Sequence, residues 1–156
     1  MKLGIMDKRI LDELQKNARI SNLELADKIG LSPSPCSRRV KQLEDDGLVD
    51  RHVTLLNQSK LQLKLTALIQ VSMDVHTPER FEAFESAVKN YPEVLECYLI
   101  TGQAADYLLK VIVPDMEYYQ EFLLGKLTRI SGVSGVQSSF VLRKAIDTTV
   151  LPLGHL

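Results

Sequence analysis

Residues 22–49 hold the pattern that most constrains how this chain folds: two short amphipathic segments joined by a glycine. Their apolar side chains recur at helical spacing, Leu23, Ala26 and Ile29 in the first segment and Cys36, Val40 and Leu43 in the second. The first segment stops at Gly30, and Ser32-Pro33 is a typical helix start. The pattern therefore predicts two helices joined by a tight turn.

Hydroxyl and cationic side chains occupy the other faces of the second predicted helix. They are Ser32, Ser34, Ser37, Arg38, Arg39 and Lys41. A helix-turn-helix uses such side chains, near the N-terminal end of its second helix, to reach phosphates and base edges in the major groove. We therefore expect contact with double-stranded DNA. The alternative is a solvated face whose cations pair with Glu44 and Asp45.

The flanking residues complete a predicted DNA-binding domain over residues 1–56. An amphipathic helix is expected over Asp7–Gln15, with Asp7 as its cap, and the helix before Gly47 ends there in the usual way. Residues 48–55 predict a short β segment, the wing of a winged helix-turn-helix, with Arg51 and His52 facing the DNA backbone. Residues 57–64 show no strong periodicity and are expected to form a linker.

Charge is divided unevenly along the chain, whose formal net charge is −1. Residues 1–64 carry 12 Lys and Arg against 9 Asp and Glu, whereas residues 65–156 carry 7 against 11. This asymmetry favours two domains with different partners. Because one weakly basic domain holds DNA poorly, we also expect several copies to act together in an oligomer.

Residues 65–156 change to a mixed pattern of strands and helices. Alternating apolar residues predict strands over 65–75, 94–101, 106–113 and 133–142, with helices beginning near 78 and 115 and a further edge strand near 148–150. The order βαββαβ predicts a ferredoxin-like domain and, with the helical first domain, an α+β chain. Apolar residues on its uncovered face favour a sheet-on-sheet homodimer: Leu68, Leu95, Leu99, Leu108 and Ile112.

With both domains in view, the chain resembles the Lrp/AsnC transcriptional regulators over nearly its whole length. The first half carries Asp7, Ile10-Leu11, Leu14, Asn17-Ala18-Arg19, Gly30-Leu31-Ser32-Pro33-Ser34-Pro35-Cys36, Arg39-Val40, Leu43-Glu44 and Gly47 of this likeness. The second half carries Glu96-Cys97, Thr101-Gly102, Asp106-Tyr107-Leu108 and Val113-Pro114-Asp115. The resemblance implies a cytoplasmic, DNA-binding regulator whose dimers assemble into larger oligomers, usually octamers. It also implies that a free amino acid binds where dimers meet and shifts oligomeric state or DNA affinity.

The effector site implied by this resemblance lies at two turns of the second domain. Its residues are Thr101, Gly102, Gln103, Ala104, Asp106 and Leu108 from the first turn, and Val133, Ser134, Gly135 and Val136 from the second. Backbone N–H groups of a glycine turn suit a carboxylate, and Asp106 suits the ammonium of a zwitterion. The apolar neighbours favour leucine or methionine. The alternative is a plain hairpin turn capped by Asp106. Three residues separate Gly102 from Asp106, where relatives usually have two.

Other classes of site find little support in the residues. His52, His76 and His155 lack metal-ligand spacing, Cys36 has no histidine placed to activate it, and no phosphate-binding loop motif is present. We therefore expect no enzyme activity, no cofactor and no membrane span. An alternative function is an amino-acid-sensing module that acts through protein contacts rather than DNA.

Overall fold

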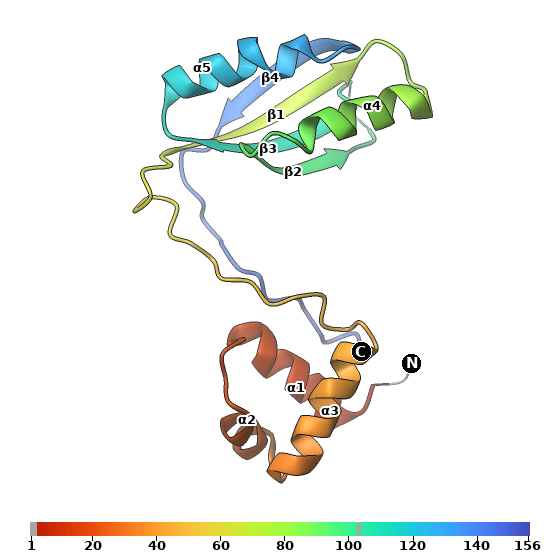
Figure 1. The fold of residues 1–156 in the computed structure, drawn as a ribbon, viewed down its shortest axis with the longest axis vertical. Helices are drawn as coiled ribbons and strands as arrows, with labels where there is room; N and C mark the ends of the chain where they lie inside the picture. Colours follow the sequence, from red (N-terminus) through yellow and green to blue (C-terminus); the bar gives the residue numbers. More distant parts are fainter. Residues whose placement is uncertain (1–2, 103) are drawn as a thin grey trace. The chain divides into compact units, whose positions relative to one another are not determined.

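A computed structural model describes residues 3–102 and 104–156 of the chain, which form two compact units (Figure 1). The head unit consists of residues up to 55 together with residues 146–156, and the sheet unit consists of residues 56–145. The expected second domain covered residues 65–156. The contacts of the final residues, 146–156, instead group this segment with the first helices.

The head unit contains three helices: α1 (Ile5–Lys16), α2 (Asn22–Ile29) and α3 (Pro33–Asp45). Their inward faces form one small core of Ile10, Leu25, Ala26, Ile29, Cys36 and Leu43. The expectation for Leu23 was wrong, because its side chain is 68% exposed. The helix turns Leu25 inward instead, beside Ala26 and one turn before Ile29.

Local polar contacts set where these helices begin and end. Asp7 is not the cap of α1: the helix begins two residues earlier, and the Asp7 carboxylate accepts the Gly4 N–H from within its first turn at 3.0 Å. Ser21 caps α2 through a reciprocal pair of bonds with Glu24, a capping box. Gly47 follows α3 in the left-handed conformation, with φ of 72°, which confirms the predicted helix end.

The predicted β segment at residues 48–55 and the predicted edge strand near 148–150 were both wrong. Neither stretch forms a strand among the described residues. The first contains apolar side chains such as Val53 and Leu55, which are exposed. A strand exists only where a neighbour completes its hydrogen-bond ladder, and within one chain neither stretch has such a neighbour.

The sheet unit has the predicted βαββαβ order. Its elements are β1 (Leu65–Met73), α4 (Pro78–Val88), β2 (Val94–Leu99), β3 (Tyr107–Val113), α5 (Met116–Gly125), the 3₁₀ turn η1 (Leu127–Arg129) and β4 (Val133–Phe140). The strands pair antiparallel in the order β2-β3-β1-β4, which is the ferredoxin-like arrangement. Helix α5 ends at Gly125, and the 3₁₀ turn η1 lies between it and β4.

Helices α4 and α5 cover one face of this sheet (Figure 1). Alternate residues of β1 and β3 fill the core beneath them, and Phe84 from α4 and Phe122 from α5 close it from above. The predicted inward face of β3 is confirmed, since Tyr107, Leu109 and Val111 are fully buried. The alternation along β3 therefore correctly indicated which of its side chains face the helices.

The uncovered face of the sheet is more polar than expected. Leu99 pairs with Tyr107 and so shares the helix-covered face, contrary to the prediction. Tyr98 donates a hydrogen bond to Glu96 at 2.7 Å, and Lys110 pairs with the same carboxylate at 3.2 Å. This Tyr98 bond, together with Lys110, lowers the pKa of Glu96.

Two further observations concern the described part of the chain as a whole. None of its helices has both the length and the apolar character needed to cross a membrane. Both cysteines are free thiols, with Cys36 buried and Cys97 exposed.

Candidate functional site

One face of α3 presents polar side chains to solvent. Ser34, Ser37, Arg38 and Lys41 are all exposed and recur at intervals of three and four residues, so they share this face. Within residues 3–102 and 104–156, neither Arg38 nor Lys41 forms an ion pair. The alternative pairing with Glu44 and Asp45 is not formed. Both cations are thus available to an anionic partner.

Arg39, predicted as a DNA contact, is directed toward α1. Its Nη1 lies 2.8 Å from Asp7 Oδ1, and that carboxylate also accepts the Gly4 N–H. This pair links α3 to the start of α1 inside the head unit. Arg39 therefore has a structural partner, in contrast to Arg38 beside it.

The start of α3 offers few backbone donors to a phosphate. Pro33 and Pro35 have no N–H, and the Cys36 N–H already donates to the Ser32 carbonyl at 3.2 Å. Ser34 alone keeps a free N–H in the first turn. Asn22 fixes this end of the helix by donating its side-chain amide to the Pro33 carbonyl at 2.8 Å. Anion binding here must depend on side chains rather than on the helix terminus.

Arg51 and His52 lie on the extended segment after α3. Both are exposed; Arg51 pairs with Asp50 at 3.0 Å, and His52 lies 3.6 Å from Glu44. Exposed pairs of this kind are weak, so either side chain can exchange its partner for a phosphate.

The two predicted effector turns lie at the same end of the sheet, on either side of β1. Val71 of β1 pairs with Tyr107 on one side and with Val136 on the other. Ser72 connects the two turns: it donates to the Ala104 carbonyl at 3.5 Å, and its own carbonyl accepts the Ser134 hydroxyl at 3.1 Å. Gln103 lies outside the described residues. Thr101 and Gly102 are exposed, and Gly102 has φ of 83°.

Asp106 is the most strongly held polar group of these turns. Its Oδ2 accepts the Met73 N–H at 2.7 Å, and its Oδ1 lies 2.8 Å from Nε2 of His76. The Asp106 side chain is 17% exposed, whereas His76 is 63% exposed. The carboxylate is thus fixed in place, and its second oxygen meets a side chain that is free to move away.

The apolar residues predicted for this site do not all face it. Val133 and Val136 pack against the core beneath the helices. Leu108 lies opposite Gln70 and Tyr98 and therefore belongs to the uncovered face of the sheet. The polar residues and backbone of the two turns are brought together, but these three side chains are not.

Three further features of this site have no signal in the sequence: His76, Ser72 and an ion pair beneath the second turn. Arg80 of α4 pairs with Asp74 at 3.2 Å and donates to Ser131 Oγ at 3.1 Å. Ser131 lies 51 residues beyond Arg80 in the chain, so the fold, rather than local sequence, brings these two side chains together. No group of metal-binding side chains occurs in the described part of the chain.

Comparisons with known proteins place both units. Residues 66–151 match the family model of the Lrp/AsnC ligand binding domain, and residues 4–50 match that of a winged helix-turn-helix DNA-binding domain. The transcriptional regulator AzlB of Bacillus subtilis is 37% identical, covering 99% of this chain and 100% of its own. The leucine-responsive regulatory protein of Escherichia coli K12 is 40% identical, covering 91% and 86%. A transcriptional regulator of Neisseria meningitidis, solved as a complex with L-methionine, has a TM-score of 0.94 at 44% identity and 99% coverage of both chains.

Proposed function

The chain belongs to the Lrp/AsnC family of transcriptional regulators, and we propose that it acts in the cytoplasm in response to free leucine or methionine. Its head unit is a DNA-binding helix-turn-helix and its sheet unit is a ligand-binding domain. The observation that carries the DNA assignment is the exposed face of α3, where Arg38 and Lys41 have no acidic partner among the described residues. The family match disfavours a module that acts only through protein contacts.

DNA binding through α3 is tested by a charge-matched pair of double variants. We expect Arg38→Ala with Lys41→Ala to weaken binding to a duplex selected from a random pool, and to lower the salt slope by about 2, one for each lost cation. Arg9→Ala with Arg19→Ala removes the same charge from exposed positions outside α3. Equal losses in the two double variants, measured by mobility shift over a salt titration, would contradict the assignment.

An aliphatic or thioether amino acid is proposed as the effector because relatives are named leucine-responsive and one was solved with L-methionine. Two groups of the turns suit the ends of a zwitterion: the backbone at Gly102, and Asp106, one oxygen of which meets the exposed His76. We expect leucine or methionine to raise the melting temperature in a screen of the twenty amino acids. Stabilisation by polar amino acids alone would overturn this choice.

The proposed assembly is a homodimer that associates further, to an octamer. It is supported by the head unit, which carries 10 Lys and Arg against 10 Asp and Glu and so binds DNA firmly only when several copies act together, and by apolar side chains on the uncovered sheet face such as Leu68. Light scattering should give a mass near eight times the 17.6-kDa chain, changing with the amino acid. A monomer under all conditions would contradict the proposal.

The proposed regulator works without catalysis or cofactor. Its family consists of transcriptional regulators. At the two turns, Asp106 pairs with His76 and Ser72 bonds to backbone, and none of these three side chains contacts a nucleophile among the described residues. Incubation with the amino acid that stabilises the protein should therefore return it unchanged.

A further inference from the structure

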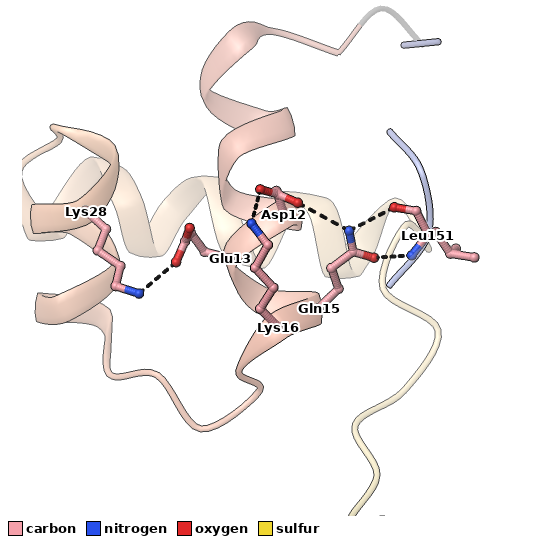
Figure 2. Close-up of polar contacts among 6 residues, drawn as sticks. All are labelled: Asp12, Glu13, Gln15, Lys16, Lys28 and Leu151. Atoms are coloured by element: carbon pink, nitrogen blue, oxygen red, sulfur yellow. Dashed lines mark hydrogen bonds and ion pairs between the residues drawn. The ribbon is translucent and has the colours of Figure 1, made fainter. Parts of the chain in front are cut away.

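The C-terminal residues 146–156, called here the strap, belong to the head unit although they follow the last strand of the sheet unit. Gln15 near the end of α1 holds the strap at one point (Figure 2). Its Nε2 donates to the Leu151 carbonyl at 3.0 Å, and the Leu151 N–H donates to its Oε1 at 2.8 Å. One side-chain amide thus satisfies both backbone groups of one residue, as a neighbouring strand would.

The orientation of this amide is fixed by its surroundings. Asp12, one turn earlier on α1, accepts a second hydrogen bond from Gln15 Nε2 at 3.4 Å (Figure 2). A flipped amide would place its oxygen against the Asp12 carboxylate and the Leu151 carbonyl, and its nitrogen against the Leu151 N–H. Only one orientation of the amide satisfies all three neighbours.

The strap is also ordered by bonds of its own. The Val150 N–H donates to Thr148 Oγ1 at 3.1 Å, and the Leu156 N–H donates to the Leu153 carbonyl at 3.2 Å. Leu153 is half-buried, whereas Leu151 is 68% exposed. Leu151 is therefore held through its backbone rather than through its side chain.

We propose that Gln15 clasps the strap so that it carries the amino-acid response from the sheet unit to the DNA-binding head, an inference that rests on the proposed function. The chain passes between the units twice, after residue 55 and after residue 145. Five residues, 141–145, separate the second crossing from the end of β4, and β4 begins at the candidate effector turn around Ser134. A shift of β4 therefore reaches α1 through the strap, without passing through the linker.

The test compares Gln15→Ala with Lys28→Ala in the full chain. Lys28 of α2 pairs with Glu13 of α1 at 2.9 Å, so its variant removes a polar contact of α1 but leaves the strap untouched (Figure 2). Hydrogen exchange of residues 146–156 is followed by mass spectrometry. DNA affinity for the selected duplex is measured with and without saturating L-leucine or L-methionine.

We expect exchange over the strap to be about tenfold faster in Gln15→Ala, as for the loss of one or two net hydrogen bonds, and unchanged in Lys28→Ala. The amino acid should bind Gln15→Ala with its normal affinity but no longer change DNA binding. If exchange over the strap is unchanged in Gln15→Ala, the proposed clasp is wrong. If exchange is faster but the amino acid still changes DNA affinity as in wild type, the proposed regulatory role of the clasp is wrong. If the wild-type chain does not bind DNA, the proposed function fails, while the exchange result still decides the clasp.

Discussion

Asp106 both contacts the backbone of β1 and belongs to the proposed effector site. Met73 fixes one of its oxygens, and the exposed His76 competes for the other. If the ammonium of the effector takes that oxygen, it must displace the histidine. We expect His76→Ala to strengthen amino-acid binding by about three- to tenfold, since a net hydrogen bond is worth roughly 1 kcal/mol. Calorimetric titration measures this, with His52→Ala in the head unit as the control. An unchanged affinity in His76→Ala would rule out competition at Asp106.

Any residue larger than glycine would be strained at position 132. Its φ is 94°, and a Cβ there would lie 2.5 Å from Arg80 Cδ and 3.1 Å from Asp74 Oδ1. Gly132→Ala must therefore displace Arg80 from Asp74 and adopt an unfavourable backbone, so we expect a loss of about 1–3 kcal/mol in unfolding free energy. Gly135→Ala, in the adjoining strand β4, is the matched control, because its Cβ would meet Ser72 at an ordinary 3.8 Å. Denaturant unfolding compares the two, and equal losses would refute the explanation.

At the level of elements, the sequence correctly predicted features that depend on residues close together in the chain. The helix ends at Gly30 and Gly47, and the inward residues of β3, follow from backbone conformation and from alternation. The β segment predicted over residues 48–55 is absent because a strand depends on a partner that local sequence does not reveal. The Arg39 pair with Asp7 and the His76 pair with Asp106 were missed for the same reason, since each joins residues about thirty positions apart.

A buried carboxylate joins the loop before β2 to the end of α5. Glu93 is 5% exposed and lies 2.6 Å from Lys126, while its Oε2 has no hydrogen-bond partner among the described residues. Burial raises the pKa of this carboxyl, but the hydrogen bond and charge of Lys126 lower the pKa by more. The pKa therefore stays below its ordinary value of 4.5. The ionised form is therefore favoured by folding. Its contribution is present above pH 4.5 and is lost as the pH falls through the folded pKa.

Lys126→Met tests how the stability contributed by Glu93 depends on pH. We expect a loss of about 1–3 kcal/mol in unfolding free energy at pH 7, because the buried carboxylate is left unpaired. The difference from wild type should shrink below pH 4.5, where Glu93 takes up a proton. Arg51→Ala breaks an exposed pair and should change stability little at any pH. Urea unfolding across pH 3–8 provides the measurement (roughly the range in which carboxylates and histidines titrate), and a difference that does not vary with pH would contradict the role of Glu93.

At the scale of the whole molecule, the two units differ in how much core they possess. Among the described residues, the head unit buries six apolar side chains, whereas the core of the sheet unit extends beneath two helices over four strands. A domain as small as the head unit is only marginally stable, so its few contacts with residues 146–156 matter more to it than to the larger unit.

A chain that ends after Ala145 should therefore melt its head unit at a lower temperature and leave the sheet unit unaffected. Scanning calorimetry, with circular dichroism to follow the helix-rich head, separates the two transitions. Equal shifts in both transitions would mean that the C-terminal residues stabilise the molecule as a whole, and no shift in either would mean that they stabilise neither unit.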